Sequence, residues 1–427
     1  MFTRVTGMSC AVCGTQVPLD APMQWVCPGA TPSDRHHVLG FNTEPAETVA
    51  TSSDNPFLSF REQLGVDAFG AAIGLDEVTR IDIIASLDVA VERIAGTGFR
   101  KTPLLRADAL SDALGFTASG GVWVKDETHN VAGSHKARHV FTEMIYLLMA
   151  EHAGLAPWGQ VSERPPLAIA SCGNAAIAAS TLARAVQWPI AVHVPEAAQE
   201  SVLHALQTLD ADVRVCPRRK SDPAGDPCVW RFRELVEQGA LAFGVQGTEN
   251  VWCLDGGRTL GWEIAEQMTH IDRMFLQVGG GAFASTCATS FYASGGSARL
   301  HAVQSEGCAP LVRAWQRFVE MGAPHNIAAT WSEVMWPWEH TPTSFADGIL
   351  DDETYDWVDI VSSMRSSHGG AVRATESNIV RAHQLAHEFT DIDVSPTGSS
   401  GLAGVLEMRQ DIKDDEKVFV VFSGHSR

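Results

Sequence analysis

Short apolar runs alternate with amphipathic stretches along most of this chain. Over residues 75–94, apolar side chains recur at helical spacing, which predicts an amphipathic helix. Short runs of apolar residues predict buried strands, and helical stretches at 140–149 and 174–186 separate some of them. The predicted strands are 167–170, 190–194, 275–278, 301–304 and 418–422. This alternation predicts an α/β fold with largely parallel sheets flanked by helices.

Length and composition narrow the class of protein. A chain of 427 residues is longer than one hydrophobic core usually serves, so two lobes are expected. The net charge of −20 argues against a nucleic-acid partner, and no apolar run approaches the length of a membrane span. The first residues lack the pattern of a signal peptide, and nine cysteines, an odd number, predict reduced thiols. We therefore expect a cytoplasmic protein without a membrane or nucleic-acid partner.

The first 45 residues have the cysteine spacing of a zinc ribbon, although the pattern is incomplete. Cys10 and Cys13 are separated by two residues, and Cys27 precedes a Pro-Gly turn. Zinc in structural sites takes four ligands, so a histidine of the pair His36-His37 would have to be the fourth. The sequence predicts a zinc-ribbon-like extension over 1–45, in which Cys10, Cys13 and Cys27 are candidate ligands of Zn²⁺. A degenerate, metal-free extension is the simpler interpretation of the incomplete pattern.

Lys136 is the first candidate for catalysis. It follows a Gly-Ser turn and precedes the apolar helical run 140–149. An amine at the start of a helix lies where the positive end of the dipole disfavours a charged ammonium. A neutral amine is what Schiff-base chemistry with a carbonyl group requires. For this residue alone, a solvated lysine at a helix start is the simpler interpretation.

Three further segments follow predicted strands, where ligands bind in open α/β sheets. Ser171 to Asn174 comes after the strand 167–170 and contains small, hydrogen-bonding residues. Gly279 to Gly281 comes after the strand 275–278 and is suited to binding an anion through backbone N–H groups. The absence of a following Lys-Ser/Thr argues against a nucleoside triphosphate. Ser423 comes directly after the last predicted strand.

Together these motifs resemble the fold-type II pyridoxal-phosphate enzymes, which include threonine synthase, serine/threonine dehydratase and the tryptophan synthase β chain. The resemblance runs from Thr102-Pro103-Leu104 through Lys125-Asp126-Glu127 and Gly133-Ser134-His135-Lys136 to Ser423. It implies a two-lobed, tryptophan synthase β-like α/β fold, pyridoxal 5′-phosphate as cofactor, an amino acid as substrate and a homodimer. The domains it implies are the extension 1–45, a large cofactor-binding domain of 46–140 and 245–427, and a small mobile α/β domain of 141–244.

The resemblance also implies a role for each matching residue. Lys136 would bind the cofactor as a Schiff base and later remove the α-proton of the substrate. Asn174 would hydrogen-bond the ring hydroxyl of the cofactor, and Ser423 the pyridine nitrogen. Residues implied for the phosphate and its surroundings are His135, Gly279, Gly280, Gly281, Ala282 and Phe283. Candidates for substrate binding are Thr128, Ser134, Ser171 and Arg138, of which Arg138 has the anchoring of the helix start as its alternative role.

The expected reaction follows from the partner of the pyridine nitrogen. A serine hydroxyl makes the ring a weaker electron sink than a carboxylate would, which favours loss of a group from the β- or γ-carbon. Local motifs are mixed: His135 before the lysine looks like tryptophan synthase β chains, whereas the segments 171–174, 346–349 and 395–398 look like dehydratases. We expect a lyase of the dehydratase or ammonia-lyase kind that catalyses β-elimination or β-replacement on a small β-substituted amino acid. Alternatives are threonine synthase-like γ-replacement with phosphate loss, tryptophan synthase β-like β-replacement, and a catalytically inactive cofactor-binding protein.

Overall fold

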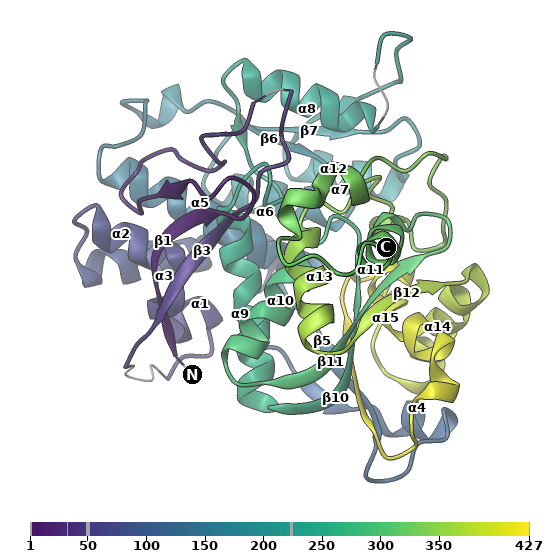
Figure 1. The fold of residues 1–427 in the computed structure, drawn as a ribbon. Helices are drawn as coiled ribbons and strands as arrows, with labels where there is room; N and C mark the ends of the chain where they lie inside the picture. Colours follow the sequence, from purple (N-terminus) through teal and green to yellow (C-terminus); the bar gives the residue numbers. More distant parts are fainter. Residues whose placement is uncertain (1, 32, 48–51, 223–224, 427) are drawn as a thin grey trace. The chain divides into compact units, whose positions relative to one another are not determined.

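The computed structural model, drawn as a ribbon in Figure 1, describes residues 2–31, 33–47, 52–222 and 225–426. The chain divides into two compact units. Unit 1 consists of Met1–Lys101, Asn130–Ala132 and Lys136–Thr259. Unit 2 consists of Thr102–His129, Gly133–His135 and Leu260–Arg427. The functional domain boundaries that the sequence suggested stay a prediction.

Unit 1 contains a parallel sheet of four strands in the order β8-β7-β6-β9. Its strands are β6 (Leu167–Ala170), β7 (Ile190–Val194), β8 (Asp212–Val215) and β9 (Leu241–Ala242). The helices α6 (Asn174–Ala185), α7 (Glu200–Thr208) and α8 (Pro227–Glu237) connect them. The strands predicted at 167–170 and 190–194 are confirmed at both ends, because their apolar side chains are nearly all buried.

A second, antiparallel sheet in unit 1 is built from the N-terminal residues in the order β2-β1-β3. Its strands are β1 (Thr3–Cys10), β2 (Gln16–Val17) and β3 (Leu39–Pro45). The remaining helices that begin in unit 1 are α1 (Pro56–Ser59), α2 (Gly65–Ala72), α3 (Glu77–Ala95), α5 (Lys136–His152) and α9 (Trp252–Gln267). The helix predicted at 75–94 is α3, which starts after the capping residue Asp76 and ends at Gly96 in a left-handed conformation.

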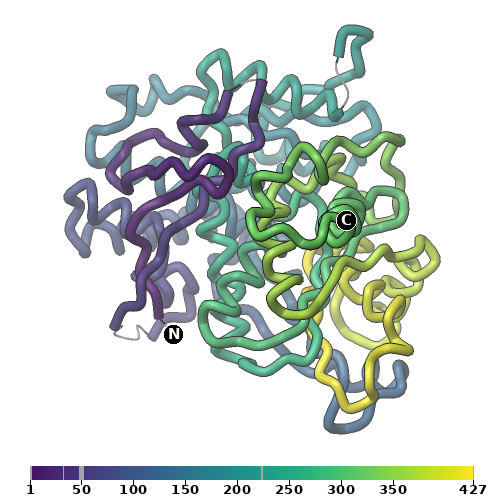
Figure 2. The backbone as a smooth tube through the Cα atoms, viewed as in Figure 1, coloured from purple at the N-terminus to yellow at the C-terminus, as the bar shows by residue number. Residues whose placement is uncertain are grey.

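Unit 2 contains a mixed sheet of six strands in the order β12-β11-β10-β13-β5-β4, in which only β4 runs antiparallel to its neighbour. The strands are β4 (Leu104–Arg106), β5 (Gly121–Asp126), β10 (His270–Gln277), β11 (Ser297–Ser305), β12 (Gly370–Ala374) and β13 (Lys417–Phe422). The C-terminal strand β13, yellow in Figure 2, lies between β10 and β5, which come from much earlier in the chain.

Helices of unit 2 follow several of these strands. They are α4 (Asp108–Ala113), α10 (Ala282–Ala293), α11 (Pro310–Glu320), α12 (Trp331–Val334), α13 (Trp357–Ser366), α14 (Glu376–Phe389) and α15 (Pro396–Glu407). Short 3₁₀ turns occur at Arg61–Gln63, Val131–Gly133, Val161–Glu163, Ala328–Thr330, Asp347–Ile349 and Arg409–Asp411. Helix α15 packs on β10, β11 and β13, and a Cβ atom on its Gly404 would overlap Val303. Glycine therefore lets this helix lie close to the sheet.

The predicted fold class is confirmed: both units are α/β structures with parallel or mainly parallel sheets and flanking helices. Among the described residues, no helix has the length and apolar character needed to cross a membrane. In unit 2, the strands β10, β13 and β5 are parallel neighbours, so their carboxyl ends lie at one edge of the sheet. The segments that follow these three strands are the ones that sequence analysis singled out.

Candidate active site

A loop of three glycines follows β10 and leads into α10. A Cβ atom on Gly279 would overlap the carboxylate of Asp351 and lie 3.1 Å from Cα of Ile349. Gly281 has a φ of 102°, a left-handed conformation that favours glycine, and the N–H of Asp356 donates to the carbonyl of Gly280 at 2.9 Å. The segment 349–356 therefore packs directly on this loop. The first N–H groups of α10 have no partner within the helix and are suited to an anion.

Ser423, after β13, contacts His135. Its Oγ accepts a hydrogen bond from the backbone N–H of His135 at 3.0 Å and lies 2.6 Å from Nδ1 of the same residue. The imidazole ring stacks on Phe283 of α10, with ring centroids 4.2 Å apart. When Nδ1 carries the ring proton, the serine accepts both bonds and its own proton remains available to donate. Unit 2 thus joins three predicted residues that are far apart in the sequence.

Two segments that resemble dehydratases lie against these residues. The N–H of Gly348 donates to Oγ1 of Thr397 at 2.9 Å, which joins 346–349 to 395–398. A Cβ atom on Gly398 would overlap the carbonyl oxygen of Ser423. The first segment thus continues into the chain that packs on the glycine loop, and the second supports Ser423. Asp351 itself was not singled out from the sequence, because no motif marks it.

Thr128 follows β5, the third strand at this edge. Its backbone N–H and its hydroxyl both donate to Oδ1 of Asp126, at 2.9 and 2.6 Å. Just before it, the buried ammonium of Lys125 donates to Glu263 at 2.8 Å and to the carbonyl of Thr102 at 2.6 Å. Because a buried charge is tolerated only when it is paired, this network fixes the end of β5. A substrate that takes the Thr128 proton would have to replace its bond to Asp126.

Lys136 is the first residue of α5, in unit 1. Three residues on, His139 is buried, and its Nδ1 lies 2.8 Å from the carbonyl oxygen of Cys253. Burial, followed by the nearby positive charge of Lys136, lowers the pKa of His139 to about 3, so this imidazole is neutral at physiological pH. Nδ1 therefore donates to the carbonyl. The structure places a neutral, fixed histidine on the helix turn that begins with Lys136.

Arg138 is also buried and donates to Oγ1 of Thr259 on α9 at 3.0 Å. A Cβ atom on Gly256 would overlap the carbonyl oxygen of Arg138, so α5 and α9 lie in close contact at this level. This contact corresponds to helix anchoring, the alternative role that the sequence left open for Arg138. Its role in substrate binding stays a prediction.

The loop that follows β6 is open. Ser171 donates its N–H to the carbonyl of His193 at 3.1 Å, and its Oγ accepts the N–H of Gly173 at 3.3 Å. A Cβ atom on Gly173 would meet no atom within 4 Å, and Cys172 is exposed. Asn174 then begins α6. The residues predicted for the active site in unit 1 are Lys136 and Arg138 on α5, Ser171 in the loop after β6, and Asn174 at the start of α6.

Comparison with known proteins decides the family. The family described as "Pyridoxal-phosphate dependent enzyme" matches residues 96–424, which is most of the chain. The chain belongs to this family. It is 25% identical to a threonine synthase of Methanosarcina acetivorans over 334 residues, which cover 76% of this chain and 74% of that protein. It is 22% identical to an L-threo-3-hydroxyaspartate ammonia-lyase of Pseudomonas over 340 residues, covering 79% of this chain and 93% of the relative.

A solved structure shows the same fold. The processed form of threonine deaminase isoform 2 from Solanum lycopersicum has a TM-score of 0.59 and 19% identity, and covers 83% of this chain and 91% of its own. Membership in the family makes this chain a pyridoxal-phosphate-dependent enzyme of fold type II, as the sequence motifs predicted. The relatives catalyse different reactions on amino acids, so membership alone does not define the reaction.

The described residues fit pyridoxal phosphate in chemical terms. The hydroxyl of Ser134, directly after Gly133, is fully buried and has no hydrogen-bond partner among the described residues, which is rare unless a ligand or water supplies one. The glycine loop leaves no room for side chains while keeping the amides at the start of α10. A phosphate needs such amides, and the ring nitrogen needs a polar partner such as Ser423.

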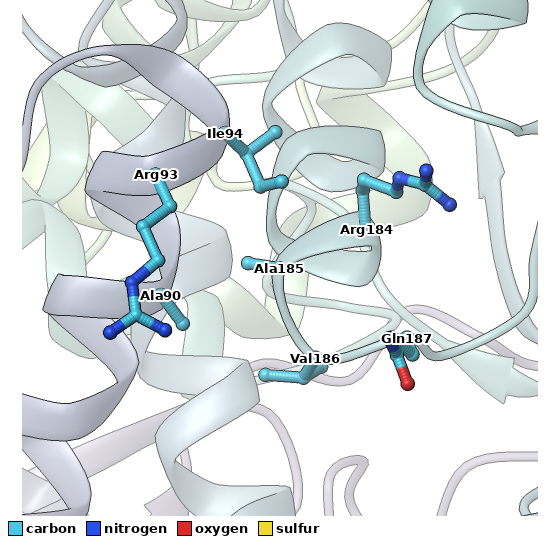
Figure 3. Close-up of a pocket in the computed structure, with 7 residues that line it drawn as sticks. All are labelled: Ala90, Arg93, Ile94, Arg184, Ala185, Val186 and Gln187. Carbon is cyan, nitrogen blue, oxygen red and sulfur yellow. The ribbon is translucent and has the colours of Figure 1, made fainter.

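A pocket of 390 Å³ in unit 1 lies elsewhere (Figure 3). It is lined by Ala90, Arg93, Ile94, Arg184, Ala185, Val186 and Gln187, from α3 and the end of α6. None of the predicted site residues lines it. Of its two arginines, Arg184 is paired with Asp210.

The cysteines predicted to bind metal are brought together. Cys10, Cys13 and Cys27 form one cluster with His37, the second histidine of the pair that the sequence left open. Cys10 and Cys27 are buried, and Cys13 is exposed. The cluster belongs to unit 1 and lies on and beside β1 of the N-terminal sheet.

Proposed function

We propose that this chain is a lyase that removes, or replaces, the β-substituent of a small amino acid. The observation that supports this proposal most is the serine, rather than a carboxylate, at the end of β13. Pyridoxal phosphate, when bound, withdraws electrons from the bonds at the α-carbon of an amino acid. Ser423 is a neutral partner for the ring nitrogen, so it does not hold that nitrogen protonated. Weaker electron withdrawal favours loss of a leaving group from the β- or γ-carbon, and the contact of Arg138 with Thr259 favours the β-carbon.

Each residue then has a task. Lys136 would hold the cofactor covalently, and its amine would take the α-proton of the substrate. His139 is the second ionisable side chain on this helix turn. Because it is neutral and held on the carbonyl of Cys253, it does not exchange protons near neutral pH. Backbone amides from Gly279 to Phe283 would hold the phosphate, and Ser423, which is held by His135, would face the ring nitrogen.

The substrate is bound by short polar side chains in this proposal. Asn174 contacts the ring hydroxyl of the cofactor, while Ser171, Thr128 and Ser134 are the candidates for the substrate carboxylate. Ser134 has an unmatched buried hydroxyl, so it gains most from a partner. In this proposal, residues 141–244 form the small domain, and residues 46–140 together with 245–427 form the large cofactor-binding domain.

Two relatives support reactions at different carbons of the substrate. The L-threo-3-hydroxyaspartate ammonia-lyase aligns over 93% of its length, which supports β-elimination. The threonine synthase supports a second candidate, replacement at the γ-carbon with loss of phosphate. That reaction needs a cation for a second phosphate. Arg138, a sequence candidate for substrate binding, is the cation nearest to Lys136 in the sequence, but it is buried and donates to Thr259. This contact favours the β-carbon reaction.

A product assay on the purified holoenzyme tests the proposal. L-serine, L-threonine, threo-3-hydroxyaspartate and O-phosphohomoserine are supplied in turn, with and without a thiol or indole nucleophile. Keto acid, ammonia and inorganic phosphate are then measured. We expect one β-substituted amino acid to give keto acid and ammonia in equal amounts, or a β-replacement product. We expect none of these products from Lys136→Ala.

Two results would contradict it. Phosphate release from O-phosphohomoserine alone would replace the first candidate by the second. A holoenzyme that binds the cofactor at Lys136 but consumes none of these amino acids, and no related β-substituted one, would overturn both.

A further inference from the structure

Four potential metal ligands lie together near the N-terminus. The Sγ atoms of Cys10, Cys13 and Cys27 and one ring nitrogen of His37 all lie within 4.8 Å of one another. Sγ of Cys10 is 3.5 Å from Nδ1 of His37, and Sγ of Cys13 is 3.5 Å from Sγ of Cys27. A tetrahedral zinc ion, with Zn–S near 2.3 Å and Zn–N near 2.0 Å, places its ligand atoms about 3.5–3.8 Å apart. The two separations of 3.5 Å match such a shell, and the remaining ligand atoms lie within 4.8 Å of one another.

The backbone around the cysteines has the turns that present thiolates to a metal. The N–H of Gly14, which has a φ of 73°, donates to the carbonyl of Cys10 at 2.9 Å and closes the first turn. In the second turn, the N–H of Gly29 donates to Sγ of Cys27 at 3.3 Å. A Cβ atom on Gly29 would lie 3.2 Å from Cε1 of His37, which is tighter than an ordinary contact. Glycine at this position therefore lets the second turn approach the cluster closely.

His37 also has the surroundings of a metal-binding histidine. Its Nδ1 faces Cys10, while its Nε2 lies 3.7 Å from the carboxylate of Asp34. A histidine that binds a metal through one ring nitrogen usually directs the other at a carboxylate or carbonyl, which fixes the ring. The cluster therefore supplies four ligands, three of them sulfur, and an orienting group for the fourth.

The chain between Cys13 and Cys27 contacts the helices of unit 1. The N–H of Gln24 donates to the hydroxyl of Tyr146 on α5 at 3.2 Å, and Nε1 of Trp252 on α9 donates to the carbonyl of Gln24 at 3.0 Å. Next to it, Trp25 packs edge-on against Tyr146, whose ring stacks on Trp252 with centroids 4.2 Å apart. A loop fixed at both ends by cluster residues thus supports α5, the helix that begins with Lys136.

We propose that Cys10, Cys13, Cys27 and His37 bind one zinc ion that holds the loop 14–26 against α5 and α9. Three thiolates and an imidazole in tetrahedral spacing are typical of structural zinc. Four protein ligands leave no open position for water or substrate, so the ion is structural. The three-stranded N-terminal sheet is too small to fold on its own hydrophobic core, and a metal ion supplies the missing stabilisation.

Metal analysis of the full-length holoenzyme tests this inference. Variants of the adjacent residues His36 and His37 serve as the matched control and test. We expect one zinc ion per chain in the wild type, in His36→Ala and in His37→Cys, which restores a fourth ligand. We expect His37→Ala to bind zinc at least about tenfold more weakly, because one of four ligands is lost. Should His37→Ala fail to fold, zinc released from the wild type by a chelator and a thiol reagent gives the same stoichiometry.

Hydrogen exchange tests the structural role. After zinc removal, amides in residues 14–26 and 136–152 should exchange faster, and those of β10 and β13 in unit 2 should not change. A wild type without metal that retains no added zinc would overturn the site, as would an iron ion in its place or a Cys13–Cys27 disulfide. Equal zinc loss in His36→Ala and His37→Ala would overturn the ligand set, and unchanged exchange in both segments would overturn the support of α5.

Discussion

The loops Ser171–Gly173 and Gly279–Gly281 have the same place in their sheets but opposite surroundings. Each follows the carboxyl end of a parallel strand and leads into a helix of 12 residues. A Cβ atom on Gly173 would meet nothing within 4 Å, whereas one on Gly279 would overlap Asp351. One loop is open, and the other is fixed by packing.

The difference shows that glycine serves two purposes in this chain. In the loop after β10, segment 349–356 occupies the space that side chains would need, so the backbone amides are held in one arrangement. Such an arrangement suits a group that stays bound, such as the cofactor phosphate. In the loop after β6, glycine leaves space that a changing group, such as the substrate, can enter. The predictions below test this assignment, starting with the largest effect.

Matched alanine variants in the two loops should behave differently. Gly279→Ala forces its methyl group against Asp351 and the backbone of Ile349, which costs about 1–3 kcal/mol of packing. We expect the dissociation constant of pyridoxal phosphate to rise about 10- to 100-fold. Gly173→Ala should change that constant less than about threefold and act on KM for the substrate instead. Equilibrium titration of both apoenzymes measures the constants, and equal effects would remove the distinction between the loops.

Ser423→Ala removes a partner of His135 at the same edge of the sheet. One neutral hydrogen bond contributes about 0.5–1.5 kcal/mol, so we expect kcat/KM to fall up to about tenfold while phosphate binding changes little. Ser426→Ala, three residues further on, is the control and should match the wild type. If the pH profile of kcat/KM and its value are both unchanged in Ser423→Ala, this serine does not contact the ring nitrogen.

The smallest expected effect concerns two buried histidines, each on the strand beside the one that leads into a loop. Burial lowers the pKa of His193 on β7, and burial with nearby Arg273 lowers the pKa of His301 on β11 to about 4. Both bind fewer protons folded than unfolded, where the pKa is about 6.5. Above pH 6.5 the two histidines therefore do not change the free energy of unfolding. As the pH falls from 6.5 toward the pKa of the folded state, they lower it.

For His301 this cost is about 1.4 kcal/mol per pH unit below pH 6.5, ending near pH 4. His301→Asn should therefore lose less of its thermal stability between pH 7.5 and pH 5 than the wild type, and His193→Asn should do the same in unit 1. Melting temperatures at the two pH values measure this. A wild type as stable at pH 5 as at pH 7.5 would contradict the neutral, buried state of both histidines.

Local sequence patterns predicted the bounds of strands that are uniformly apolar. They failed to predict the bounds of strands in which polar residues are buried by partners distant in the sequence. Both ends of β6 and β7 were predicted, but β10 begins at His270, five residues before the predicted start. The reason is Arg273, which is buried because Glu416 pairs with it at 2.7 Å from 143 positions away. No pattern within β10 contains that partner.

The same rule applies to the site. Lys136, the glycine loop and Ser423 are marked by local motifs, and sequence analysis named them. The bond between His135 and Ser423 joins positions 288 residues apart, and the packing of Asp351 on Gly279 depends on a segment without a motif. His36 and His37 are adjacent and chemically identical in the sequence, and only the path of the backbone shows which one faces Cys10.

The central claim is that Lys136 carries the cofactor, and mass mapping tests it most directly. The holoenzyme is treated with borohydride, which makes the link between pyridoxal phosphate and its lysine permanent, and is then digested and sequenced by mass spectrometry. The account predicts a phosphopyridoxyl group on Lys136 alone. Lys125, buried and paired with Glu263, is the internal control and should be unmodified. Labelling of Lys125, or of no lysine in a protein saturated with the cofactor, would contradict the account.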